Sequence, residues 1–174
     1  MKWKKIADDQ PPVGFRRNFS RHYILPSGEK KAFDITDVGH TVAVLALTTQ
    51  DEVVLVRQYR PGPQAMCLEL PGGLVDPGES WVEAAGRELR EETGYEAGRL
   101  EYVSTVYMGA YVQGWKHYFL APGCKLVGEQ KTESDEFIGV ELWTMGDFRG
   151  LLRDWDSCEV GGAYQALDAL GRLG

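Results

Sequence analysis

Two continuous apolar runs, at residues 41–47 and 53–56, limit the folds that this chain can adopt. Neither run shows the alternation of polar and apolar residues that is typical of a strand with one face in water. Both therefore predict strands that are buried on both faces. Because residues 48–52 between them are polar and few, they predict a turn.

The remaining sequence predicts a mixed order of strands and helices. Residues 66–70 read as a strand that Pro71 and Gly72 end, and from Ser80 onward the periodicity becomes helical. Further strands are expected at residues 100–107, 115–120 and 137–143, a helix capped by Thr144 at residues 145–152, and a last helix at residues 159–170. This order indicates a mixed α/β sandwich and not a regular βαβ array.

The chain is expected to form one main domain with a small N-terminal addition. Its 174 residues suit a single self-sufficient core. Residues 1–39 alternate short apolar runs with turn signals at residues 11–12, 26–28 and 37–39, which predicts two or three antiparallel strands that must pack on something. We assign residues 40–174 to the main domain and residues 1–39 to a β unit for dimerisation or substrate contact.

The charge and the cysteines exclude several kinds of function. A net charge of −7 without a basic run provides no large electrostatic surface for nucleic acid or an anionic membrane. Cys67, Cys124 and Cys158 lack the spacing of a zinc site, so reduced thiols are expected. The N-terminus lacks an apolar signal segment, and no run approaches the roughly 18 apolar residues of a membrane helix. A cytoplasmic protein is therefore expected.

The helix predicted at residues 80–93 has recognisable ends and two different faces. Ser80 and Glu83 have the spacing of a capping box, and Gly94 is suited to end the helix. Val82, Ala85 and Leu89 are predicted to share the apolar face of this helix. Glu88, Glu91 and Glu92 are predicted to lie on the opposite side, within a sector of about 100° around the helix axis. Three carboxylates so close together repel one another unless cations or protons intervene.

These carboxylates are candidate ligands of a divalent metal ion. Carboxylate oxygens hold Mg²⁺ or Mn²⁺ in proteins, commonly together with the phosphate oxygens of a substrate. An acidic protein that handles phosphates needs such cations to balance both charges. Arg87 is placed to pair with a neighbouring carboxylate and hold its orientation.

The spacing of residues 73–95 resembles the Nudix box. Gly73 is followed by five residues and Glu79, then by seven residues and the run Arg87-Glu88-Leu89-Arg90-Glu91-Glu92-Thr93-Gly94. Every fixed position of the box matches, and Tyr95 occupies its final apolar position. The resemblance implies a Nudix α/β/α sandwich with a mixed sheet and a pyrophosphohydrolase that acts on phosphoanhydride bonds.

The resemblance also implies a set of metal ligands. Glu88 and Glu92 would be the principal ligands, Glu91 would share or bridge, and Gly72 would offer its carbonyl oxygen. The implied cofactor is Mg²⁺, with Mn²⁺ as the alternative. Bound metal ions would act as Lewis acids on the diphosphate, supply a hydroxide-like water and clamp the two phosphates.

Other residues would support the chemistry. Glu79 and Arg87 would hold the site together by salt bridge or hydrogen bond. The implied catalytic residues are Glu91 and a glutamate of a late loop, for which Glu133 and Glu136 are the candidates. We prefer Glu136 as the base that takes the proton of the attacking water.

Features outside the box resemble the ADP-ribose and nucleotide-sugar pyrophosphatase branch. They are the N-terminal strands, the run Gln58-Tyr59-Arg60 and the approach Leu68-Glu69-Leu70-Pro71-Gly72-Gly73. They imply substrate binding by Arg57, Gln58, Arg60 and Glu69, and a homodimer. The competing interpretation is that the side chains of Arg57, Gln58 and Arg60 are surface groups at a strand end and that Glu69 lies on an exposed face.

The implied reaction is hydrolysis of a nucleoside diphosphate sugar, ADP-ribose first, to a nucleoside monophosphate and a sugar phosphate. One difference from the family pattern weakens ADP-ribose as the specific substrate. Many ADP-ribose pyrophosphatases have a proline in the region where this chain has residues 108–114, which contain none. A dinucleoside polyphosphate or nucleoside triphosphate is the second substrate class, and a non-catalytic nucleotide-sugar sensor is the different kind of function. Aromatic residues that could stack on a base, but are more typical of a core or dimer contact, are Trp3, Phe15, Tyr107, Tyr111 and Trp115.

Overall fold

The computed structural model describes residues 4–8, 17–132, 137–153 and 160–172. Its elements in chain order are β1 (Lys4–Asp8), β2 (Arg17–Ile24), β3 (Lys30–Thr48), β4 (Val53–Arg60), β5 (Ala65–Glu69), α1 (Trp81–Thr93), β6 (Tyr95–Glu96), β7 (Glu101–Tyr107), β8 (Val112–Leu126), β9 (Gly139–Trp143), α2 (Met145–Leu151) and α3 (Val160–Ala169). They form two compact units, one of residues 1–40 and 107–116 and one of residues 41–106 and 117–174. The predicted domain boundary between residues 39 and 40 stays a prediction.

The first unit is built on three antiparallel strands. β1 pairs with β2, and β2 pairs with the first part of β3 in an unbroken register from Arg17 opposite Asp37 to Ile24 opposite Lys30. The turn between β2 and β3 places Gly28 at a φ of 87°, which a glycine adopts without steric cost. Within this unit the ring of Phe33 stacks on that of Tyr111, with 6.2 Å between centroids.

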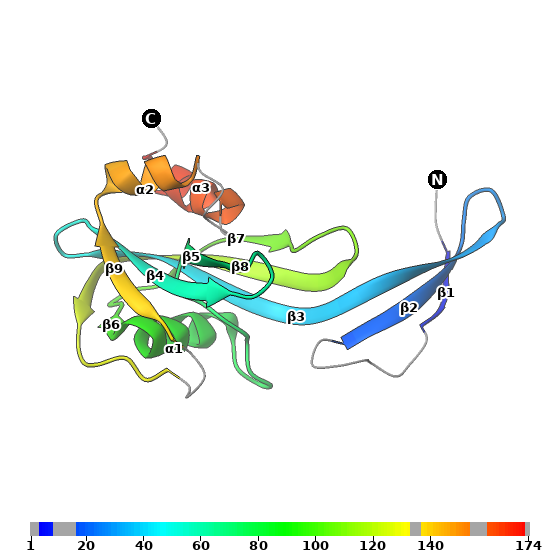
Figure 1. Cartoon of the computed structure of the whole chain (residues 1–174), viewed down its shortest axis with the longest axis horizontal. Helices are drawn as coiled ribbons and strands as arrows, with labels where there is room; N and C mark the ends of the chain where they lie inside the picture. Colours follow the sequence, from blue (N-terminus) through cyan, green and yellow to red (C-terminus); the bar gives the residue numbers. More distant parts are fainter. Residues whose placement is uncertain (1–3, 9–16, 133–136, 154–159, 173–174) are drawn as a thin grey trace. The chain divides into compact units, whose positions relative to one another are not determined.

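The second unit has a mixed sheet with helices on both faces. β4 pairs antiparallel with β3, β5 and β9, and β8 pairs with β3, β6 and β7. Within this unit α1 lies on one face of the sheet, and α2 and α3 lie on the other (Figure 1). The predicted α/β/α sandwich is therefore confirmed.

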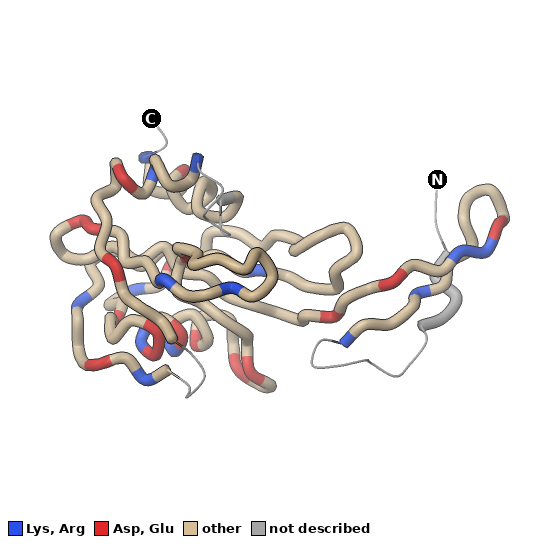
Figure 2. Tube along the Cα trace, in the orientation of Figure 1, with Lys and Arg blue, Asp and Glu red and all other residues tan. Residues whose placement is uncertain are grey.

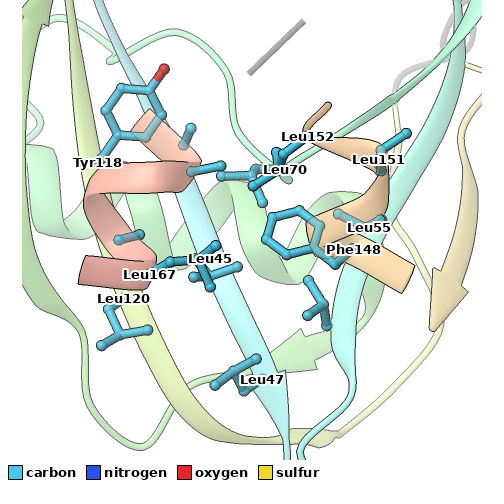
Figure 3. Packing of buried hydrophobic residues seen from close by; sticks show 14 of the residues in the cluster. Leu45, Leu47, Leu55, Leu70, Tyr118, Leu120, Phe148, Leu151, Leu152 and Leu167 are labelled. Carbon is cyan, nitrogen blue, oxygen red and sulfur yellow. The ribbon is translucent and has the colours of Figure 1, made fainter. Parts of the chain in front are cut away.

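The alternation of side chains along β3 divides the core into two layers. Ala43, Leu45 and Leu47 belong to a buried cluster that α2 and α3 cover with residues such as Phe148 and Leu167 (Figure 3). The intervening residues Val42, Val44 and Ala46 belong to a second cluster that contains Ala84, Ala85 and Leu89 of α1. Both faces of β3 are thus buried, as the continuous apolar run predicts.

Three sequence predictions need correction. The residues 37–39 predict a turn, yet β3 continues through them with Gly39 at a φ of 75°. β8 extends well beyond the predicted residues 115–120 at both ends. Val82, predicted on the apolar face of α1, is 47% exposed. In the described ranges of the chain, no helix is long and apolar enough to span a membrane.

Candidate active site

Helix α1 begins and ends as its sequence predicts. The Ser80 hydroxyl accepts a hydrogen bond from the Glu83 amide, and the Glu83 carboxylate accepts one from the Ser80 amide, which completes a capping box. At the other end Gly94 has a φ of 74° and donates its amide to the Arg90 carbonyl. Between these ends, acidic and basic residues follow one another closely along α1 (Figure 2).

Arg87 is the centre of the polar network on α1. Its Nη1 donates to Glu88 Oε1 at 2.9 Å and to Glu91 Oε2 at 3.1 Å. Its Nε and Nη2 donate to the two carboxylate oxygens of Glu79, both at 2.9 Å, and Nη2 also donates to the Leu74 carbonyl. Such fork geometry is available only to a guanidinium, so one side chain orients three carboxylates.

Glu79 closes the loop that leads into α1. Its Oε2 accepts the Asp76 amide at 3.1 Å, and its own amide donates to the Asp76 carbonyl. The hydrogen bonds from Arg87 lower the pKa of Glu79 below its usual value. These contacts hold Glu79 against Arg87 and the loop, and its supporting role in the site stays a prediction.

The position of Glu92 differs from the predicted division of α1 into a polar and an apolar face. It was expected on the polar side of α1, but it is only 5% exposed and lies on the buried side with Leu89. Its Oε2 accepts the backbone amide of Gly72 at 2.8 Å. Burial of a carboxylate is costly unless it is paired, so this hydrogen bond fixes Glu92 beside the loop that follows β5.

Gly72 and Gly73 are sites of close approach between the loop and its neighbours. A Cβ atom on Gly72 would overlap the backbone of Val42 and Ala43 in β3. A Cβ atom on Gly73 would lie 2.5 Å from Oε1 of Glu88. Glycine at both positions therefore lets the loop contact β3 on one side and the carboxylates of α1 on the other.

The carboxylate oxygens of this network are of the chemical kind that binds a divalent cation. Oxygens of Glu88 and Glu91 converge on a single positively charged nitrogen of Arg87, so both already turn toward a cation. Carboxylates are the hard ligands that Mg²⁺ and Mn²⁺ prefer. Among the described residues, no group of three His, Cys, Asp or Glu side chains is gathered closely enough to hold a metal ion. The ligand assignments stay predictions.

Gln58, Arg60 and Glu69 form a second polar cluster, on β4 and β5. Glu69 is 4% exposed, so the interpretation that it lies on an exposed face is wrong. Its carboxylate accepts from Arg60 Nε at 2.9 and 3.0 Å and from Gln58 Nε2 at 3.2 Å. The antiparallel register places these three residues on one face of the sheet. Glu69 lies opposite Val56, and Val56 shares its face of β4 with Gln58 and Arg60, which are two and four residues further along the strand.

Arg57 points to a different partner. It forms a two-pronged ion pair with Glu141 of β9, whose carboxylate also accepts the indole N–H of Trp143 at 2.8 Å. The Arg57 guanidinium, and then Trp143, lower the pKa of Glu141. Sequence reasoning missed Glu141, and only the pairing of β4 with β9 reveals it. The polar residue between two apolar neighbours, Val140 and Leu142, was the available signal.

Two of the predicted catalytic residues cannot be placed. Glu133 and Glu136 lie outside the described residues, as do Trp3, Phe15 and Cys158. Tyr107 and Tyr111 are exposed at 78% and 60%, whereas Trp115 stacks on His40 with 4.8 Å between ring centroids. Cys124 is buried, and burial raises the pKa of its thiol to about 11, which fits a reduced structural residue.

Comparison with known proteins agrees with the fold and the box. The model of the NUDIX domain family matches residues 39–158. The chain therefore belongs to the Nudix family, and it is a Nudix hydrolase that acts on pyrophosphate bonds. Nudix hydrolases generally use a divalent metal ion.

The chain is also similar to individual proteins of known name. It is 31% identical to the ADP-ribose pyrophosphatase of Bacillus subtilis over 80% of this chain and 77% of that protein. It is 33% identical to the methanol dehydrogenase activator of Bacillus methanolicus over 71% of this chain and 68% of that protein. The crystal structure of an ADP compounds hydrolase superposes with a TM-score of 0.83 at 22% identity, over 99% of this chain and 98% of that chain, which shows a shared fold.

Proposed function

We propose that the protein hydrolyses the diphosphate bond of a nucleoside diphosphate sugar, ADP-ribose first among several, with Mg²⁺ as the cofactor. The observation that carries the proposal is the convergence of Glu88 and Glu91 on one cationic group, with Glu92 fixed beside them at Gly72. Similarity to the Bacillus subtilis ADP-ribose pyrophosphatase supports the substrate class. The products are a nucleoside monophosphate and a sugar phosphate.

The acidic residues of α1 meet the main electrostatic requirement of the reaction. A diphosphate repels an approaching nucleophile, and a bound divalent cation would supply Lewis-acid stabilisation and an activated water. Glu88, Glu91 and Glu92, with the Gly72 carbonyl oxygen, would hold it. Arg87 holds Glu88 and Glu91 near one another without the divalent cation, because it neutralises part of their charge.

The base is assigned to the acidic loop. In the proposal Glu136, or else Glu133, takes a proton from the attacking water, and Glu91 assists by orienting that water. The pKa of such a base must lie near the working pH for efficient proton transfer. Substitution of each residue by glutamine separates the two candidates, since only the true base gives a large loss of kcat.

The cluster on β4 and β5 is assigned to substrate binding. Arg60 is 42% exposed while its partner Glu69 is buried, so the positive charge of the guanidinium lies at the surface, where it would attract an anionic ligand. Gln58 shares the same carboxylate. Arg57, which directly precedes Gln58 in β4 and is held by Glu141, is also assigned to substrate binding.

A dinucleoside polyphosphate or a nucleoside triphosphate is the second substrate class, favoured by the absence of a proline at residues 108–114. Both classes contain the phosphoanhydride bond that the site is suited to cleave. A non-catalytic sensor would be expected to lack one of the acidic residues of the box, and this chain retains them all.

The test is phosphate release, with added phosphatase, from ADP-ribose, ADP-glucose, GDP-mannose, UDP-glucose, diadenosine polyphosphates and nucleoside triphosphates, with and without Mg²⁺. Metal-dependent turnover that is fastest with a diphosphate sugar supports the proposal. Faster turnover of the polyphosphates selects the second class. Tight binding of a diphosphate sugar without turnover of any compound would replace the enzyme with a sensor.

A further inference from the structure

The segment of residues 127–131 runs along the carboxyl end of α1. The Val127 amide donates to the Gly94 carbonyl at 3.0 Å, and the Lys131 amide donates to the Glu91 carbonyl at 2.8 Å. A Cβ atom on Gly94 would overlap the Gly128 carbonyl, so only glycine allows this close approach. The segment therefore follows the helix end by backbone contacts at several successive positions.

One side chain of this segment reaches the same helix end. Gln130 donates from Nε2 to the Glu92 carbonyl, and the same nitrogen donates to the Ile138 carbonyl at 3.2 Å. A primary amide nitrogen has two hydrogens, so it can make both bonds at once. Ile138 directly precedes β9, and Gln130 thus joins the last turn of α1 to the start of that strand.

These contacts satisfy carbonyl groups that the helix itself cannot. The last four carbonyls of an α-helix have no partner within the helix. In α1 the Arg90 carbonyl is bonded to the Gly94 amide, whereas those of Glu91 and Glu92 are bonded to Lys131 and Gln130. The two residues whose carbonyls this segment contacts, Glu91 and Glu92, are also two of the three glutamates assigned to the metal.

We propose that Gln130 is a positioning residue for the metal-binding carboxylates of Glu91 and Glu92. Its amide fixes the backbone at the last turn of α1, from which both side chains extend. The inference rests on the proposed function for its catalytic consequence, but its structural part stands on the hydrogen bonds alone. Lys131 acts through its backbone, so Gln130 is the position where a substitution can remove the contact.

The test compares three variants by their affinity for Mn²⁺, measured by electron paramagnetic resonance without substrate. Gln130→Ala removes both donors, and we expect a dissociation constant about three- to tenfold higher, the size expected of one hydrogen bond. Gln130→Glu has nearly the same shape but no N–H, and it should weaken binding at least as much. Gln130→Lys restores donors at a helix end that favours positive charge, so it should remain within about twofold of wild type.

Electrostatics alone predicts the opposite order. An added negative charge would tighten the binding of a cation, and an added positive charge would weaken it. Tighter binding by Gln130→Glu together with weaker binding by Gln130→Lys would therefore overturn the proposal, as would unchanged binding in all three variants. Gln50→Glu, in the exposed turn between β3 and β4, is the matched control for a change of net charge.

Two further readouts separate this inference from the proposed function. Hydrogen exchange of the Lys131 amide should accelerate in Gln130→Ala and Gln130→Glu but not in Gln130→Lys, and equal exchange in all would overturn the proposal. With active wild-type enzyme, the Ala variant should lower kcat and leave the KM of the nucleotide unchanged at saturating Mg²⁺. If the wild type hydrolyses none of the panel, the proposed function fails while metal binding and exchange still decide the role of Gln130.

Discussion

At the scale of single residues, Glu92 has a structural role, and the proposed function gives it a chemical one. Its carboxylate is buried and accepts the Gly72 amide, so a neutral residue of the same shape can keep that hydrogen bond. We expect Glu92→Gln to fold with a melting temperature close to that of wild type. Its turnover should fall roughly 100-fold or more, because metal-assisted stabilisation supplies several kcal/mol and each 1.4 kcal/mol is about tenfold. Steady-state kinetics at saturating Mg²⁺ measure the loss.

Glu83→Gln is the control for this prediction. It lies on the same helix, changes charge equally and preserves the capping box, since glutamine also serves at that position. Its kcat should stay within about twofold of wild type. Near wild-type turnover in Glu92→Gln would remove Glu92 from the metal site.

The ion pair of Glu79 with Arg87 predicts a pH-dependent stability. Because Arg87 lowers the pKa of Glu79 below 4.5, the folded protein binds this proton less tightly than the unfolded chain does. The stabilisation is complete above the unfolded pKa and is lost as the pH falls through the folded pKa. Glu79→Gln should cost about 1–2 kcal/mol at neutral pH, the size of a charge-assisted hydrogen bond, and the difference should shrink as the pH falls below the ordinary pKa of a glutamate.

Urea unfolding of both proteins across this pH range measures the difference. The exposed Glu129, substituted by glutamine, provides the comparison for loss of a carboxylate outside the network. A constant gap between wild type and Glu79→Gln at all pH values would contradict the ionic origin of the stabilisation.

The sequence identifies the acidic residues of the site but not their partners. The fixed spacing of Glu79, Arg87 and Glu88 predicts a shared network because neighbours on a helix and its leading loop are local. The burial of Glu69 and Glu92 could not be predicted, because their donors Arg60 and Gly72 come from other strands and loops. Contacts of this kind depend on strand register, which one sequence does not specify.

At the scale of elements, α3 contains two adjacent glycines with different surroundings. A Cβ atom on Gly162 would overlap the Tyr118 ring, whereas a Cβ atom on Gly161 meets nothing within 4 Å. Gly162→Ala should lower the free energy of unfolding by about 1–3 kcal/mol through overpacking. Gly161→Ala should raise it by up to about 1 kcal/mol, since alanine is the better helix former. Denaturant unfolding of the pair is the measurement, and equal effects would mean that Tyr118 moves aside freely.

Elements with local signals were predicted most accurately. α1 and α2 have hydroxyl caps at Ser80 and Thr144, and the structure confirms both. The lengths of β3 and β8 were underestimated because a long strand is maintained by its pairing partners and not by its own residues. The turn signal at Gly39 was misleading, since a glycine with positive φ can also occur within a strand.

At the scale of the whole molecule, we propose that the protein is a homodimer. The resemblance of its sequence to the ADP-ribose and nucleotide-sugar pyrophosphatase branch implies this state. The first unit exposes Tyr107, Met108 and Tyr111, and large apolar side chains at a surface are typical of protein contacts. Light scattering at micromolar concentration should give twice the chain mass of 19.4 kDa. Tyr107→Ser should weaken the association, and a monomer mass at every concentration would contradict it.

The tight contacts at Gly72 and Gly73 have a consequence for evolution and engineering. Because β3 occupies the space on one side and the Glu88 carboxylate occupies it on the other, neither position can acquire a side chain without moving a strand or a ligand. Selection for new substrates cannot act there. It must act at exposed positions, of which the cross-strand pair Tyr59 and Met66, 56% and 48% exposed, is one that can vary without displacing either glycine contact.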